Sequence, residues 1–269
     1  GLTLDDVAAV TGNVAESTLR TALGLPPRPV PRTPPWQPDG PERAGFHHLS
    51  HAAFAFHTSG FREALVVTVD GQGDDDTLVV FRGDATGLHR LYAVAHQPVS
   101  IGGVYEDATR LLGFGQGGEG KLMGLAALGT TDASWQRSLL QPAGPWRVAS
   151  PFLGVPNHPL RTVGRAPWAG LDFERHPQFA ASVQAALEQT VLAIVRAAHA
   201  DTGLSDVCLG GGVALNCSLN GRLAREPWLH DLWLPPSPAD PGNAAGAALL
   251  WAAREGKVPL ERLRRGGLG

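Results

Sequence analysis

Two histidines one helical turn apart are the first residues of this sequence whose spacing could support chemistry. His47 and His51 lie in the segment 47–56, HHLSHAAFAF. Residues four positions apart share one face of an α-helix, so the two imidazoles could bind one metal ion. The alanine-rich run favours a helix, beneath which Phe54 can pack. The alternative interpretation is a buried helix start whose histidines cluster without a function.

An acidic segment that contains glycine follows an apolar, β-branched run. The run EALVVTVD predicts a β-strand that ends at Asp70. Asp70 could hold a cation there, while Gly71 and Gly73 would let backbone amides approach an anion such as a phosphate. Further strands are predicted over 77–82 and 88–96, which leaves open a plain β-hairpin with an acidic turn. After the paired histidines, Asp70 is a candidate third metal ligand.

A glycine-rich turn separates two predicted helices. Ser100 is a candidate N-cap for a helix over 101–112. Residues 117–121, GGEGK, then lead into a second helix, so free amides and Lys121 could face a phosphate. The spacing of a P-loop is absent from this stretch.

A glycine triplet follows a short buried strand. The strand predicted at 206–209 runs into Gly210, Gly211 and Gly212. These glycines would let a flat ring or a sugar lie against the backbone. The alternative is a tight strand-to-helix turn, which one glycine usually satisfies. Asn216 could contact a ligand or only cap its own helix.

Asp240 precedes a predicted helix of small residues over 242–253. As an N-cap of that helix it would be ordinary. As a fourth ligand it would complete a set of two imidazoles and two carboxylates with His47, His51 and Asp70.

The remaining segments frame these candidates. The longest predicted helix covers 176–200, and its apolar face is core rather than a site. Another strand is predicted at 230–234. Residues 4–23 predict short elements, the proline-dense 24–45 predict a surface loop or linker, and 144–170 predict an irregular insert.

The composition excludes several classes of protein. A chain of 269 residues can bury a sizeable core, as one large domain or two small ones. The net charge of -3 gives no basic footprint for nucleic acid. Cys208 and Cys217 fit neither a disulfide framework nor a CxxC pair, so we expect a reducing compartment, the cytoplasm. No apolar run is long enough to span a membrane, and no signal-peptide pattern opens the chain.

Six motifs occur in an order that resembles the O-carbamoyltransferase family. They are HHLSHAAFAF, VTVDGQGD, IGGVYEDATRLLGF, GEGKLMGLAALG, LGGGVALNCSLNGRL and PPSPADPGNAAGAAL. The family carbamoylates hydroxyl groups of antibiotics, nodulation factors and related natural products. The resemblance implies an α/β fold of the actin/hexokinase-like class, with ATP and a metal in a cleft between two lobes. The first lobe is expected at about residues 1–100 and the second at about 101–255.

The resemblance implies roles for individual residues. His47 and His51 match the metal-binding HxxxH of the family, and Asp70 and Asp240 match its acids. The positions implied for nucleotide binding are Gly71, Gly73, Glu106, Lys121, Gly210, Gly211, Gly212 and Asn216. Glu106 lies where related enzymes contact the ribose, whereas His48 and His57 are expected to be structural. Two imidazoles and two carboxylates suit iron, zinc or manganese, and the family suggests iron.

The chemistry implied by the resemblance has two stages. Carbamoyl phosphate and ATP give a carbamoyl-adenylate, and the hydroxyl group of a small-molecule acceptor then attacks its carbonyl. The metal would neutralise phosphate charge and polarise the reacting groups. No catalytic side chain is assigned, and the resemblance allows a homodimer.

Two parts of the family pattern have no match in the chain. One is the opening strand-turn-strand with its HD motif, and the other is the C-terminal domain that makes the carbamoyl-adenylate. We therefore expect a fragment of a longer enzyme, with an incomplete first lobe and no adenylate-forming domain. The alternative is a degenerate ATP- and metal-binding module without catalysis of its own. A sugar-kinase-like activity ranks last, because such kinases do not need an HxxxH pair.

Overall fold

The computed structural model describes residues 46–96, 99–144, 146–150, 176–256, 258 and 262–263. Its helices are α2 (Phe46–His57), α3 (Ile101–Leu111), α4 (Glu119–Ala126), α5 (Ala133–Leu139), α6 (His176–Thr202), α7 (Cys217–Leu223) and α8 (Asn243–Arg254). Its strands are β1 (Ala64–Gly73), β2 (Asp76–Asp84), β3 (Gly87–Ala95), β4 (Gln141–Pro142), β5 (Val148–Ala149), β6 (Asp206–Gly210) and β7 (Asp231–Trp233). Two short 3-10 turns are η4 (Gly212–Leu215) and η5 (Asp240–Gly242).

One mixed sheet forms the centre of the described chain. Its order is β3-β2-β1-β6-β7. The neighbours β1, β2 and β3 are antiparallel, whereas β1, β6 and β7 run parallel. This mixed sheet with helices confirms the predicted α/β class. Strands from both sides of residue 100 belong to the same sheet, and the division into two lobes stays a prediction.

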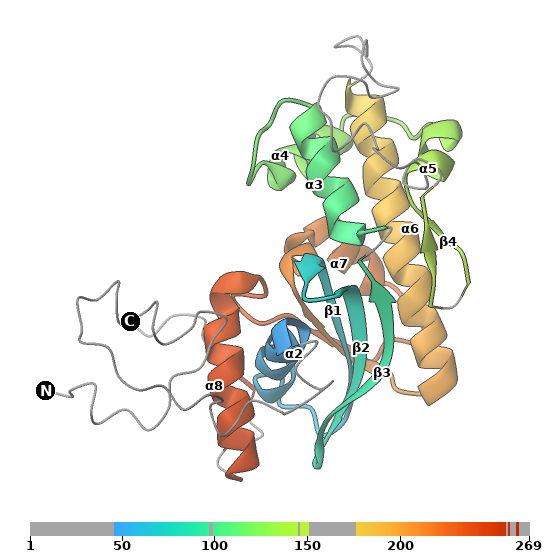
Figure 1. Cartoon of the computed structure of the whole chain (residues 1–269). Helices are drawn as coiled ribbons and strands as arrows, with labels where there is room; N and C mark the ends of the chain where they lie inside the picture. Colours follow the sequence, from blue (N-terminus) through green and yellow to red (C-terminus); the bar gives the residue numbers. More distant parts are fainter. Residues whose placement is uncertain are drawn as a thin grey trace, which may run out of the picture.

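Helices cover both faces of the sheet, as Figure 1 shows. The alternating side chains of β1 explain this arrangement, because successive residues of a strand point to opposite faces. Leu65, Val67 and Val69 pack into the core with α3 and α6. Ala64 and Val66 pack on the other side with α2. Beyond α2 lies α8, which forms an outer layer over α2 (Figure 1).

Helix α2 forms where the alanine-rich run predicts it, and its alanines are almost completely buried. Small residues let α8 approach it closely. A Cβ atom at Gly246 would lie 1.9 Å from the carbonyl oxygen of Ser50, so only glycine fits at this crossing. The close contact fixes the start of α8, and with it Asp240, over the first turn of α2.

The first hairpin differs from its prediction. Contrary to the strand end predicted at Asp70, β1 continues to Gly73, which pairs with Asp76. The pairing with β2 is irregular between Val69 and Gly73, and Asp70 lies inside this irregular stretch. Glycine is needed there because a Cβ atom at position 73 would lie 2.5 Å from Nε2 of His48. The strand can therefore run directly beneath α2.

Most other predicted elements are present. Ser100 caps α3 and accepts a hydrogen bond from the amide of Gly103. The long helix predicted over 176–200 is α6, and the strand predicted at 206–209 is β6. Asp240 is not the N-cap of α8, because η5 intervenes and the cap position is Gly242.

Several predictions lie outside the described residues. They concern the segments 4–23 and 24–45 and most of 144–170. Within the part of the chain that is described, no helix is both long and apolar enough to cross a membrane.

Candidate metal and nucleotide site

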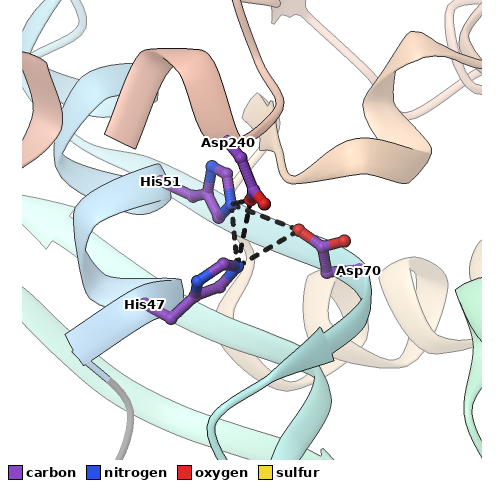
Figure 2. Close-up of side chains that lie close together, drawn as sticks. All are labelled: His47, His51, Asp70 and Asp240. Atoms are coloured by element: carbon purple, nitrogen blue, oxygen red, sulfur yellow. Dashed lines mark hydrogen bonds and ion pairs between the residues drawn. The ribbon is translucent and has the colours of Figure 1, made fainter. Parts of the chain in front are cut away.

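Four side chains from three separate elements converge at one point (Figure 2). His47 and His51 come from the first turns of α2, Asp70 from β1, and Asp240 from η5. The Nε2 atoms of the two histidines lie 3.2 Å apart. Asp70 Oδ2 lies 3.4 Å from His47 Nε2 and 3.2 Å from His51 Nε2. Asp240 Oδ1 lies 3.4 Å from both ring nitrogens. The structure thus brings together the four residues predicted as metal ligands.

These distances match a compact metal site. Around an ion with bonds of about 2.1 Å in tetrahedral geometry, neighbouring ligand atoms lie about 3.4 Å apart. All four ligand atoms lie within 4.8 Å of one another. Two imidazole nitrogens and two carboxylate oxygens form a donor set that borderline divalent ions accept. The residues present therefore fit a divalent metal ion.

Burial differs strongly among the four groups. The His51 side chain is only 1% exposed, and Asp70 is 17% exposed. The side chain of Asp240 is 71% exposed. The site therefore has a fixed inner side on α2 and β1, and an outer side where η5 meets solvent.

The two acids perturb the protonation of the site. Burial lowers the pKa of His47, but the hydrogen bond to Asp70 and the charges of Asp70 and Asp240 outweigh it, so the pKa is raised. Burial raises the pKa of Asp70, but hydrogen bonds with His47 and His51 hold it well below its usual range. Asp70 is consequently a carboxylate at neutral pH, as a metal ligand must be.

A buried amide beside the histidines is unsatisfied. Asn243 is 4% exposed, and its Nδ2 lies 3.2 Å from His51 Nε2. Its Oδ1 has no hydrogen-bond partner among the described residues. Buried polar atoms normally have hydrogen-bond partners. The unsatisfied Oδ1 therefore indicates that the hydrogen bonds of Asn243 would change if a metal ion bound the histidines. No pattern in the neighbouring sequence singles out Asn243 as a site residue.

The opposite side of Asp70 borders a cavity of about 350 Å³. It lies between β1, the helices α3, α4 and α6, and the turn η4. Its lining includes Gly71, Tyr105, Glu106, Glu119, Gly212 and Asn216. A cavity of this size matches the lower end of small-molecule sites. Asp70 belongs both to the four-residue cluster and to the cavity wall.

The predicted glycines divide into two groups. Gly71 and Gly212 line the cavity, and their amides donate to Asp70 at 2.8 and 3.2 Å. Gly73, Gly210 and Gly211 do not line it; they permit close packing instead. A Cβ atom at Gly211 would lie 2.2 Å from the carbonyl oxygen of Val69, and its φ of +87° also favours glycine. The anion held by the two cavity amides is therefore Asp70 itself.

A buried hydrogen-bond network supports the cavity wall at Tyr105 and Asn216. Gln184 Nε2 donates to Glu188 at 2.7 Å and to Asn216 Oδ1 at 2.9 Å. Gln184 Oε1 accepts from Asn216 Nδ2 at 2.9 Å and from the Tyr105 hydroxyl at 2.8 Å. Asn216 Oδ1 also accepts from the amide of Leu219, so Asn216 both caps α7 and lines the cavity.

Sequence patterns could have revealed part of this network. Gln184 and Glu188 are spaced four residues apart on a helix that is otherwise apolar on that side, and both are buried. Interpreting the whole face of α6 as core hides them. Tyr105 gives no such signal, because its ring is buried and only its hydroxyl is polar.

Glu106 and Lys121 differ in their placement. Glu106 lines the cavity and forms an ion pair with Arg110. Lys121 is exposed on α4 and is not among the residues that line the cavity. The charged residues of the described lining are all acidic, namely Asp70, Glu106 and Glu119. A phosphate in this cavity therefore needs a cation from elsewhere.

Residues 43–249 match the carbamoyltransferase N-terminus family, and the chain belongs to this family. It is 36% identical over 234 residues to nodulation protein NolNO of Sinorhizobium fredii. This match covers 83% of the chain and 34% of that protein. The chain is also 36% identical over 225 residues to nodulation protein NolO of Bradyrhizobium diazoefficiens. This match covers 81% of the chain and 40% of that protein. The chain thus spans well under half the length of these relatives.

A solved structure shares the fold. Full-length HypF, in a phosphate- and nucleotide-bound form, superposes with a TM-score of 0.52 at 13% sequence identity. The match covers 77% of this chain and 42% of HypF. At this identity the likeness concerns the fold alone.

Proposed function

We propose that this chain is the ATP- and metal-binding part of an O-carbamoyltransferase. The enzyme would transfer a carbamoyl group from carbamoyl phosphate, through a carbamoyl-adenylate, to a hydroxyl group of a small-molecule natural product. The observation that carries the proposal is that Asp70 belongs both to the four-residue cluster and to the cavity wall. It joins the four-residue cluster to the cavity in a chain that belongs to the carbamoyltransferase N-terminus family.

The fold supports a finer proposal as well. A sheet with three antiparallel strands followed by two parallel ones, and helices on both faces, agrees with one half of an actin/hexokinase-like fold. We propose this class for the chain. In α/β sheets, ligands bind beyond the carboxyl ends of the parallel strands. Asp70 follows the part of β1 that pairs with β6, and Gly212 lies two residues beyond the end of β6.

The metal ligands would be His47, His51, Asp70 and Asp240. The resemblance suggests iron, and zinc or manganese also fit this donor set. When bound, the ion would neutralise phosphate charge and polarise the reacting carbonyl. The amides of Gly71 and Gly212 hold the Asp70 carboxylate in place for this task.

The nucleotide would occupy the cavity beside this site. Asn216 and Tyr105 form its buried polar wall, and Glu106 offers a carboxylate to which ribose hydroxyls could donate. In the transfer step, the acceptor oxygen bonds to the carbamoyl carbon. The bond from that carbon to the phosphate oxygen breaks, AMP leaves, and the hydroxyl proton passes to a base.

The test uses radiolabelled carbamoyl phosphate with ATP and a panel of hydroxyl-bearing acceptors, including aminoglycosides and chito-oligosaccharides. The protein is expressed from its complete natural gene. We expect label on an acceptor only when ATP is present, and its loss in the variant Asp70→Asn. Label transfer that is independent of ATP, or no transfer to any acceptor by a protein that binds ATP and metal, would contradict the proposal.

A further inference from the structure

The side chain of Asn243 lies against both metal-ligand histidines. Asn243 begins α8, and its Nδ2 lies 3.2 Å from His51 Nε2 and 3.5 Å from His47 Nδ1. The side chain is 4% exposed, and Oδ1 has no hydrogen-bond partner among the described residues. In this arrangement the amide nitrogen donates toward an imidazole nitrogen that still has its lone pair.

If a metal ion bound the two Nε2 atoms, the Asn243 amide would have to accept a hydrogen bond here instead of donating one. A neutral imidazole carries one ring proton, so a ring whose Nε2 binds a metal carries the proton on Nδ1. Nδ1 of His47 would then be a donor, and Nε2 of His51 could no longer accept. The NH₂ group of Asn243 would face a donor on one side and an occupied lone pair on the other.

A half-turn of the amide about its last side-chain bond resolves the conflict. It exchanges Nδ2 and Oδ1, and places the oxygen 3.5 Å from His47 Nδ1. A small movement would shorten this to a normal hydrogen bond of about 3 Å. The same rotation gives Oδ1 the partner that it lacks, and it moves Nδ2 to the position that Oδ1 leaves.

We propose that Asn243 is a positioning residue of the metal site. Its amide oxygen accepts the Nδ1 hydrogen of His47 and holds that ring with Nε2 toward the ion. Groups that accept the second ring N–H of a metal-bound histidine fix its tautomer and its orientation. The inference rests on the proposed metal site.

The packing of α8 explains why this position suits the task. Gly246 brings α8 into contact with α2 one turn later, which holds Asn243 between the two histidines. Asp240 precedes it on η5 by three residues. A single structural unit would therefore supply a ligand from its turn and a hydrogen-bond acceptor from its helix.

The test measures cobalt(II) affinity and the visible absorption spectrum of the cobalt-loaded full chain. The variants are Asn243→Leu, which removes the acceptor, and Asn243→Asp, which keeps it. Asn220→Leu is the matched control. Asn220 also has a buried Oδ1 without a partner in the described part of the chain, but it lies on α7, where its Nδ2 donates to the Ala214 carbonyl. Urea unfolding of the metal-free proteins checks the fold, and Asn243→Ala replaces the leucine variant if that variant does not fold.

We expect Asn243→Leu to weaken cobalt(II) binding about 10- to 100-fold. The spectrum at saturation should keep its shape, because the ligands are unchanged. Asn243→Asp should bind at least as well as the wild type, and Asn220→Leu should bind like it. Wild-type affinity in Asn243→Leu would overturn the proposal, as would a changed spectrum at saturation, which would make Asn243 a direct ligand. If the wild type binds no cobalt, the proposed metal site itself fails.

Discussion

The imidazoles of His47 and His51 meet almost nitrogen to nitrogen, at 3.2 Å. One protonated and one unprotonated Nε2 atom can share a hydrogen bond at this distance, whereas two atoms of the same kind would repel each other. Two carboxylate oxygens approach the same point from the other side. A divalent cation satisfies all four groups together, which is why we regard the cluster as a metal site rather than a hydrogen-bonded core.

Asp70 is the residue on which the site depends most. Replacing it with asparagine removes a negative charge and a ligand, and we expect metal affinity to fall by at least about 100-fold. Mutation of residues that only hydrogen-bond to a metal ligand lowers metal affinity by up to about 100-fold, and loss of a ligand should cost at least as much. Competition titration with a coloured chelator measures the effect. Asp75→Asn is the control, since Asp75 is exposed in the same hairpin and carries the same charge. Equal losses in the two variants would indicate a general charge effect instead.

His48 has a structural task that predicts a pH dependence. It is fully buried between the Thr68 hydroxyl and the Asp76 carbonyl, and burial lowers its pKa to about 4. The pKa of His48 in the folded state is below the unfolded value of 6.5. The neutral His48 side chain therefore contributes fully to the free energy of unfolding above pH 6.5. This contribution is lost as the pH falls toward 4.

Urea unfolding at pH 7 and at pH 4.5, with chelator present, measures this contribution. In the wild type His48 should account for about 2–3 kcal/mol of the loss between the two pH values. The variant His48→Gln lacks the titrating group, so its loss should be smaller by that amount. An unchanged difference between the two pH values would show that His48 is not the group responsible.

At the scale of elements, the site depends on how closely α8 packs against α2. The variant Gly246→Ala would place a Cβ atom 1.9 Å from the Ser50 carbonyl oxygen, where neither backbone can yield cheaply. We expect α8 to move outward and the free energy of unfolding to fall by about 1–3 kcal/mol. Asp240 would move away from the histidines, so metal affinity should fall as well.

The matched control is Gly124→Ala on α4. A Cβ atom there meets nothing within 4 Å, so this change should stabilise the chain by about 0.4–1 kcal/mol. Chemical denaturation of both variants provides the comparison. Gly246→Ala with wild-type stability and metal affinity would refute the role given to this helix contact.

The sequence predicts elements well where one local pattern decides them. The alanine run after His47 and His51 is sufficient to place α2, and the apolar, β-branched run EALVVTVD is sufficient to place β1. The local sequence could not predict the exact end of β1. That end depends on a tertiary contact, because the strand passes close beneath α2 and only glycine at position 73 leaves room for His48. Asp240 needed the family resemblance, since its approach to α2 depends on a tertiary contact.

Residues that complete the site from another element were harder to predict. Asn243 resembles an ordinary helix start, and nothing in the local sequence indicates that two histidines lie beside it. Gln184 lies within a long apolar helix whose pattern predicts core. Lys121 follows the glycines but lies exposed on α4 outside the cavity lining, so its contact with a phosphate stays a prediction.

At the scale of the whole molecule, the charge of the cavity constrains its ligand. The charged residues of its described lining are carboxylates, and the amides of Gly71 and Gly212 already bind Asp70. A polyphosphate would meet repulsion there unless a cation accompanies it. We therefore expect ATP affinity to fall by at least about tenfold when divalent ions are chelated, which corresponds to about 1.4 kcal/mol.

Calorimetric titration of ATP, with magnesium or with EDTA, measures this dependence. Adenosine is the control ligand, because it carries no phosphate and its affinity should not respond to chelation. ATP that binds equally tightly in EDTA would mean that cationic groups outside the described lining neutralise the phosphates.

We propose that the cluster on α2, β1 and η5 holds an ion that the neighbouring nucleotide needs. The most direct measurement determines metal content and ATP affinity together, in the wild type and in the double variant His47→Ala/His51→Ala. His57→Ala, on the same helix but outside the cluster, is the control. We expect a stoichiometric divalent ion in the wild type and the control, its loss in the double variant, and a parallel fall in ATP affinity. A folded wild type that holds no ion and binds ATP only as well as the double variant does would show that this cluster does not hold an ion for the nucleotide.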